Sequence, residues 1–153
     1  MSATNRRKFL GRGVAVAAAA TVAAVPGKTQ EKAAKRVIYR NGEKPKGTPR
    51  MSGTVAYGNL IFISGVGYHK EGDITVHTKA VLDSIKRQLE SAGSSMEKVI
   101  KCNVYLSDLK DYDAMNKVYD GSFGAEPPAR TTIAAAGGIP GNSLVEIDVI
   151  ACL

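Results

Sequence analysis

Two charged side chains in the C-terminal quarter of the sequence have the types and spacing to act on a small organic acid. Arg130 follows Pro127-Pro128-Ala129 and precedes the β-favouring run Thr131-Thr132-Ile133, so it is expected at the start of a strand. Its planar guanidinium can bind a carboxylate through two parallel hydrogen bonds. Glu146, sixteen residues later in an alternating strand pattern, is a carboxylate suited to passing a proton in a partly dry cleft.

Both charges also have simpler interpretations. Arginine and glutamate side chains are mostly exposed in proteins, so Arg130 could be a surface loop residue and Glu146 a solvent-facing charge on an edge strand. The two residues alone leave these alternatives open. The pattern of the surrounding chain has to decide between them.

The hydrophobic pattern predicts six strands and two helices. The strands are expected near residues 36–40, 54–57, 60–64, 98–106, 131–136 and 144–152. Gly58-Asn59 is expected to form a two-residue hairpin turn. A helix from about Thr75 to Ala92 follows from a 3.6-residue apolar period that stops at Gly93. A second helix begins near Asp108, and its apolar face is interpreted as packing: Leu109, Tyr112, Met115, Tyr119 and Phe123.

Strand parity separates an apolar face from a mixed one. In the last strand the apolar face comprises Val145, Ile147, Val149 and Ala151, and the other face includes Glu146 and Asp148. The strand at 98–106 divides similarly, with Ile100, Cys102, Val104 and Leu106 expected on the apolar face. Two helices can cover only one face of such a sheet. The mixed face must therefore meet water or another subunit, and we infer an oligomer.

The order of several motifs resembles the RidA/YjgF family of reactive intermediate, or imine, deaminases over roughly residues 36–153. Each motif alone is weak, but their order and spacing make the resemblance specific. The segments that carry it are Gly58 to Gly65, Leu82 to Gly93, Lys101 to Leu109, Met115 to Tyr119, Phe123, Pro128-Ala129-Arg130, and Val145 to Ala151. The resemblance implies an α+β fold of the chorismate-mutase-like type, with a single mixed β-sheet and two helices on one face, assembled as a homotrimer with its sites between subunits.

The resemblance also implies roles for individual residues. Arg130 would bind the carboxylate of a 2-imino acid, and Glu146 would hold or activate the water that attacks the imine carbon. The positions that match the family's substrate pocket are Ser64, Gly65, Asn116, Thr132 and Met51. Thr132 stands where many members have cysteine. Met51 stands where many deaminases have tyrosine, and methionine cannot donate the phenolic hydrogen bond.

These roles imply a hydrolase that converts 2-imino or enamine acids into 2-keto acids and ammonia without a cofactor. Two alternatives stay open. A non-catalytic module that binds small carboxylates, or a holdase-like protein, fits an exported copy that lacks a supply of imines. An endoribonuclease, a label the family has also carried, is disfavoured because residues 51–153 carry nine basic against twelve acidic groups. We therefore expect no nucleic-acid partner.

The N-terminal region has the form of an export signal. Asn5-Arg6-Arg7-Lys8-Phe9-Leu10 resembles a twin-arginine signal and precedes a short apolar run, so residues 1–24 are expected to direct the protein to the periplasm. Residues 25–35 would form a basic linker and residues 36–153 the RidA/YjgF-like domain. The apolar run is too short to span a bilayer comfortably, and no stable membrane span is expected once the signal is removed. Removing it lowers the formal net charge from +7 to +3.

Metal chemistry is not expected. His69 and His77 are isolated and form no H-E-x-x-H motif. Cys102 and Cys152 belong to no C-x-x-C pair, and each lies in an apolar strand pattern. Both cysteines are interpreted as small core residues.

Overall fold

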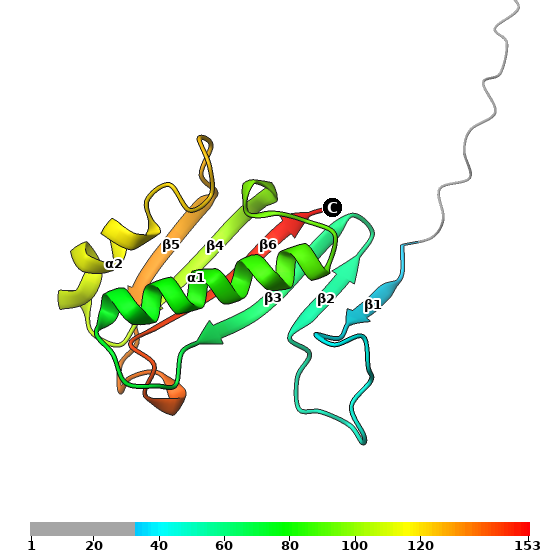
Figure 1. Ribbon diagram of the computed structural model, residues 1–153, viewed down its shortest axis with the longest axis horizontal. Helices are drawn as coiled ribbons and strands as arrows, with labels where there is room; N and C mark the ends of the chain where they lie inside the picture. The colour runs from blue at the N-terminus through cyan, green and yellow to red at the C-terminus, as the bar shows by residue number, and fades with distance from the viewer. Residues whose placement is uncertain (1–32) are drawn as a thin grey trace, which may run out of the picture. The chain divides into compact units, whose positions relative to one another are not determined.

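The structure, a computed structural model, describes residues 33–153, whose course is drawn in Figure 1. The predicted export signal and most of the predicted linker lie outside these residues. The strands are β1 (Lys35–Ile38), β2 (Thr54–Tyr57), β3 (Leu60–Gly67), β4 (Val99–Leu106), β5 (Ala129–Ala134) and β6 (Val145–Cys152), and the helices are α1 (Ile74–Ser91) and α2 (Tyr112–Tyr119). Within the described part, neither helix has the length and apolar character needed to cross a membrane.

All six strands form one sheet in the order β1-β2-β3-β6-β4-β5. Every neighbouring pair is antiparallel except β4 and β5, which run parallel, so the sheet is mixed as the resemblance implied. Gly58 and Asn59 form the predicted hairpin turn, because Tyr57 pairs directly with Leu60. The β4–β5 pair is parallel because α2 and its flanking turns provide the crossover that such a connection requires.

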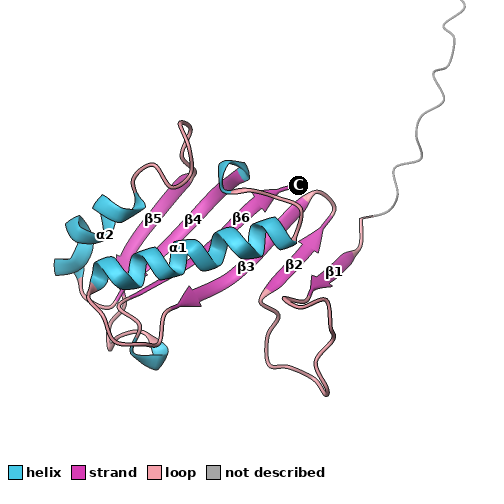
Figure 2. Ribbon diagram, viewed as in Figure 1, coloured by secondary structure: helices cyan, strands magenta, loops and turns pink. Residues whose placement is uncertain are grey.

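Both helices lie on the same face of the sheet, as Figure 2 shows, and the core is the layer between them. Asp73 caps the N-terminus of α1: its side chain accepts a hydrogen bond from the backbone N–H of Val76 at 2.9 Å. The predicted apolar face of α1 is buried, with Val81, Ile85 and Leu89 in the core. His77, on the same face, is also buried, and its Nδ1 accepts a hydrogen bond from the N–H of Leu144.

The strand parities are confirmed for β6 and for most of β4. Val145, Ile147, Val149 and Ala151 are all buried in the core. The prediction for Ile100 is wrong: its side chain is 50% exposed, whereas Val99 is buried. A register shift between Val99 and Lys101, in the pairing with β6, adds a residue there, and such a bulge reverses the alternation on one side of it.

The apolar face predicted for the second helix is confirmed only in part. Met115, Tyr119 and Phe123 are buried, but Leu109 is 60% exposed, so its assignment to the packing face is wrong. Leu109 belongs to a 3₁₀ turn that precedes α2 and therefore does not share its 3.6-residue period. Phe123 lies beyond the end of α2.

The second face of the sheet is uncovered in the part of the chain that the structure describes (Figure 2). Exposed apolar side chains lie along it, including Phe62 and Ile133. They alternate with polar and charged residues, among them Asp148, whose carboxylate accepts a hydrogen bond from the Asn103 amide at 2.9 Å. The mixed face predicted from strand parity is thus present.

Candidate active site

Arg130 lies near the start of β5, where its side chain points towards the helix side of the sheet. Arg130 pairs with Cys102 of β4, and Cys102 is buried in the core. Paired residues on neighbouring strands lie on the same face of a sheet, so Arg130 also faces the helices. The Arg130 Nη1 donates a hydrogen bond to Asn116 Oδ1 at 2.8 Å, and Nη2 donates to the Tyr112 hydroxyl at 3.3 Å. The structure thus brings two of the predicted site residues, Arg130 and Asn116, into contact.

Aromatic rings also hold the guanidinium. Its central carbon lies 4.6 Å from the centre of the Tyr119 ring and 5.8 Å from that of Tyr112. Among residues 33–153, no carboxylate forms an ion pair with Arg130. The cation is therefore fixed in orientation by neutral groups, which leaves its charge available to an anion.

A pocket of about 280 Å³ lies beside this cation. Tyr119, Phe123 and the consecutive prolines Pro127 and Pro128 contribute to its wall together with Arg130. Proline has few conformations, so this part of the wall is stiff. The lining also includes Asp120, so a carboxylate bound to the guanidinium fork would lie against a stiff wall that contains both apolar groups and one acidic residue.

Two hydroxyl groups near Arg130 have unusual surroundings. Tyr119 Oη and Thr132 Oγ1 are buried, and neither has a hydrogen-bond partner in the described part of the chain. Thr132 lies two residues after Arg130 on β5 and therefore shares its face. Burial raises the pKa of Tyr119, and burial also raises the pKa of the Cys102 thiol to about 11. The groups beneath Arg130 are thus neutral, and none of them competes with a ligand for its charge.

Ser64 and Gly65 occupy an irregularity in β3. The pairing of β3 with β6 shifts register between Ile63 and Val66, and the two predicted pocket residues lie within this bulge. The Ser64 N–H donates to the Gly53 carbonyl at 3.0 Å, which continues the pairing of β3 with β2 by one residue. The bulge therefore interrupts the pairing of this segment with β6 and leaves its pairing with β2 regular.

Glu146 lies against Gly65. A Cβ atom at position 65 would come 2.7 Å from the carboxyl carbon of Glu146, which is closer than real Cβ contacts. Only glycine therefore leaves room for this carboxylate. Glu146 is half-buried on the uncovered face of the sheet and pairs across the strands with Tyr105. The pKa of Tyr105 is raised, first by burial and then by its contacts with Asp148 and Glu146.

Met51, Ser64 and Gly65 line a second and larger pocket of about 630 Å³. This pocket lies between the loop that joins β1 to β2 and the C-terminal half of α1. Met51 is exposed in it and contributes a thioether to its wall.

Within one chain, the predicted site residues form two separate groups. Arg130, Asn116 and Thr132 lie on the helix side, whereas Glu146 shares the uncovered face with Tyr105 and Ile133. Arg130 pairs with Cys102 of β4 and Glu146 pairs with Tyr105, three residues further along that strand. Three residues correspond to roughly 10 Å at the usual rise of a strand. The structure does not bring Arg130 and Glu146 together in a single chain.

Two supporting residues were assigned a different role from the sequence. Tyr112 and Tyr119 were interpreted as packing groups, but both contact the Arg130 guanidinium. Their spacing carried the signal, because positions 112, 116 and 119 follow one another at four and three residues and so share a helix face. An arginine that needs neutral partners would be served by such a face.

Metal ligation finds no obvious site in this region. Among the described residues, no group of three or more His, Cys, Asp and Glu side chains is close enough to hold a metal ion. Both cysteines are free thiols.

The chain is similar to known proteins of one family. The family model described as Endoribonuclease L-PSP matches residues 42–153. A RutC family protein from Pyrococcus abyssi is 38% identical over 125 residues, which cover 77% of this chain and 97% of that protein. The mitochondrial protein mmf2 from Schizosaccharomyces pombe is 41% identical over 105 residues, covering 63% of this chain and 82% of that protein.

Solved structures agree with this assignment. A putative endoribonuclease from Thermotoga maritima is 31% identical in sequence and superposes with a TM-score of 0.68. The match covers 77% of this chain and 97% of the Thermotoga chain. A member of the YjgF family from Neisseria meningitidis is 32% identical, with a TM-score of 0.68 over 79% of this chain and 96% of that chain. The chain belongs to the Endoribonuclease L-PSP family, which is the RidA/YjgF family that the motifs resembled.

Proposed function

We propose that the protein hydrolyses 2-imino or enamine acids to 2-keto acids and ammonia, as a homotrimer whose sites are completed between subunits. The observation that carries this proposal is the state of Arg130. Its guanidinium is oriented by Asn116, Tyr112 and Tyr119 and has no acidic partner in the described residues. A bidentate cation held in this way is suited to the carboxylate of a small acid.

The reaction requires one carboxylate base and no redox step. A water molecule held by Glu146 attacks the carbon of the protonated imine: a C–O bond forms, the C=N π bond opens onto nitrogen, and Glu146 takes up one water proton to leave a neutral carbinolamine. Glu146 then gives that proton to the amine nitrogen, the C–N bond breaks as the C=O double bond forms, and the hydroxyl proton passes to the departing ammonia. The products are a 2-keto acid and ammonium. Gly65 supports this role because it leaves space for the Glu146 carboxylate next to exposed backbone.

Assembly is part of the proposal because one chain does not unite the two charges. Arg130 and Glu146 lie on opposite faces of the sheet, so a substrate that contacts both must lie between two copies. The uncovered face carries the apolar residues Phe62 and Ile133, which association would bury. A trimer follows the family resemblance.

A carboxylate-binding module is a second candidate. The clamp around Arg130 is complete within one chain and does not involve Glu146. Met51 also removes a hydrogen-bond donor from the other pocket. Binding without turnover is therefore chemically reasonable for this chain.

Two substitutions separate these candidates. Arg130→Lys keeps the positive charge but loses the fork, so affinity for a 2-keto acid and turnover of its imine should both fall, by roughly 1.5–3 kcal/mol for one charge-assisted hydrogen bond. Glu146→Gln keeps the shape but removes the base, so binding should survive while hydrolysis falls by about 10²-fold or more. Calorimetry measures binding, and a coupled assay that releases 2-iminobutanoate from a dehydratase measures turnover.

Asp148→Asn is the matched control for Glu146→Gln. Asp148 lies on the same strand and the same face, two residues further on, and is engaged by Asn103. It should leave the rate of hydrolysis unchanged. An unchanged rate in Glu146→Gln would show that Glu146 is not the base. A wild-type protein that binds keto acids but never accelerates hydrolysis would establish the binding module instead.

A further inference from the structure

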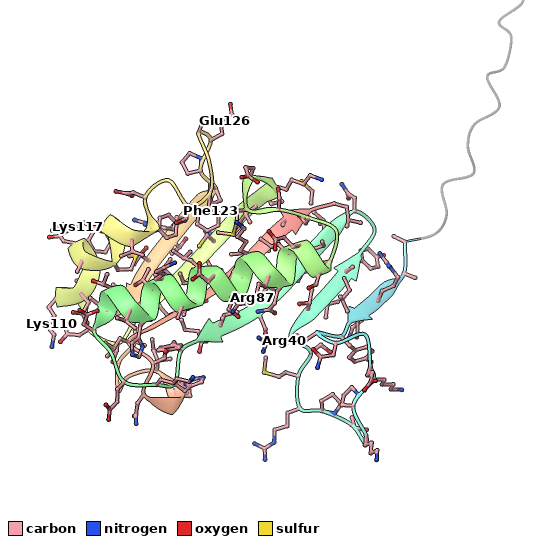
Figure 3. The ribbon with its side chains drawn as sticks, in the orientation of Figure 1. Arg40, Arg87, Lys110, Lys117, Phe123 and Glu126 are labelled. Atoms are coloured by element: carbon pink, nitrogen blue, oxygen red, sulfur yellow. The ribbon has the colours of Figure 1, made fainter. Side chains whose placement is uncertain are left out.

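The larger pocket, which contains Met51, Ser64 and Gly65, also has two arginines in its wall. Arg87 comes from the C-terminal half of α1 and Arg40 from the loop after β1, and both line the same space of about 630 Å³. Figure 3 labels both side chains, Arg87 on α1 and Arg40 on that loop. Neither arginine has a role that follows from the sequence motifs.

The residues that line this pocket include cations but no acid. None of its lining residues is an aspartate or glutamate, and in the described part of the chain neither arginine forms an ion pair. Gln88 lines the same wall, and its amide oxygen accepts a hydrogen bond from Thr54 at 3.3 Å, which leaves the amide N–H groups as donors. Two cations and a neutral donor without a competing acid form a binding place for an anion.

Gly65 connects this pocket to the predicted base. It lines the pocket, and the Glu146 carboxylate lies against the position that its Cβ would occupy. A substrate whose reacting carbon lies next to Gly65 and Glu146 can therefore extend its side chain into the pocket. A volume of about 630 Å³ is large for the side chain of a short aliphatic acid, since whole ligand pockets measure about 300–1,000 Å³.

We propose that Arg40 and Arg87 bind a second carboxylate, at the far end of the side chain of a dicarboxylic 2-imino acid. The inference rests on the proposed function for the identity of the reacting group. The loop that contributes Arg40 carries further cations, Lys44, Lys46 and Arg50, against Glu43 alone. This excess would attract a dianion more strongly than a monoanion as it approaches.

The test compares two stable product analogues by calorimetry on the full assembly. 2-Oxoglutarate carries the second carboxylate and 2-oxobutanoate does not. The wild-type protein should bind 2-oxoglutarate about tenfold more tightly, the lower end expected for charge-assisted hydrogen bonds, because both arginines are partly solvated. Arg87→Gln and Arg40→Gln should each lower the affinity for 2-oxoglutarate much more than that for 2-oxobutanoate, so that the ratio of the two falls towards one.

Lys86→Gln is the matched control. Lys86 is exposed on α1 next to Arg87, but it does not line the pocket. Its charge instead contributes to the lowered pKa of Glu97, which is due mainly to hydrogen bonds with the Glu97 backbone and with Ser95. The ratio of affinities should be unchanged in this variant. An equal loss in Lys86→Gln and Arg87→Gln would overturn the proposal, because it would show a general effect of net charge.

The outcomes for the pocket and for the proposed function are distinct. Wild-type hydrolysis of 2-iminobutanoate without a preference for 2-oxoglutarate would support the proposed function and overturn the second-carboxylate site. A preference for 2-oxoglutarate that depends on Arg87, in a protein that does not hydrolyse imines, would support the pocket and overturn the proposed function.

Discussion

Gly65 contributes both to the larger pocket and to the position of the Glu146 carboxylate. It lies in the bulge, lines the larger pocket, and leaves room for the Glu146 carboxylate. No positive φ angle makes glycine necessary there, so the requirement comes from space alone. The resemblance indicated position 65 as a pocket residue. It did not indicate that its missing side chain is what leaves room for the Glu146 carboxylate.

Gly65→Ala is therefore expected to reduce activity without unfolding the protein. The new methyl group would displace the Glu146 carboxylate, and a shift of about 1 Å in a catalytic group can cost on the order of 10²-fold in rate. The melting temperature should stay close to that of the wild type, because position 65 is exposed and has ordinary backbone angles. Coupled-assay kinetics and thermal unfolding test the two halves of this prediction. Full activity would show that the carboxylate does not act from its present position.

Residue identities were easier to predict than residue surroundings. Arg130 and Asn116 were assigned to one pocket from motifs, and they are in contact. Tyr112 and Tyr119 were missed because an aromatic stripe at helical spacing usually packs. Their shared face with Asn116 was a signal in the sequence, and their contacts with the Arg130 guanidinium give that face its second role. Arg130 and Glu146 are separated because their side chains lie on opposite faces of the sheet. Strand parity could have predicted the face for Glu146 but not for Arg130.

At the scale of elements, α1 depends on its N-terminal cap. The Asp73 carboxylate satisfies the N–H of Val76, one of the groups that the first turn leaves unpaired. Asp73→Ala should lower the free energy of unfolding by about 1 kcal/mol, and Asp73→Asn should restore most of it, since asparagine caps equally well. Urea titration measures both variants. An equal loss in the two would indicate that charge, and not the hydrogen bond, is the important property.

The elements were predicted well wherever the apolar period was long. The limits of α1 differ from those expected by only a residue at each end, and β2 is as predicted. β3 continues to Gly67, beyond the expected end at residue 64, because the bulge interrupts its alternation without ending the strand. The bulge at Ile100 misled the parity argument for the same reason. One inserted residue is invisible in a pattern of period two, since it resembles the end of the strand.

At the scale of the whole molecule, the uncovered sheet face predicts association. Ile133→Glu should place a charge among apolar groups that meet another copy, so it should dissociate the assembly, whereas the wild type should sediment as about three chains. Val76→Glu is the control, because Val76 is similarly exposed but lies on α1, on the opposite side of the sheet. Sedimentation equilibrium at micromolar concentration distinguishes the species. A wild-type protein that remains a monomer there would refute both the trimer and the shared site.

The central position of β6 has a consequence for biosynthesis. β3 and β4 do not pair with each other; each pairs with β6, which lies between them in the sheet although it is the last of the six strands to be made. The two halves of the sheet thus cannot join until residue 152 has left the ribosome, and at about 5–20 residues per second β3 waits for several seconds with one edge unpaired. During that time the nascent chain presents an open strand edge, which is a substrate for chaperones and for pairing with neighbouring nascent chains. Slowing translation between β3 and β6 should therefore lower the yield of folded protein more than slowing it before β3.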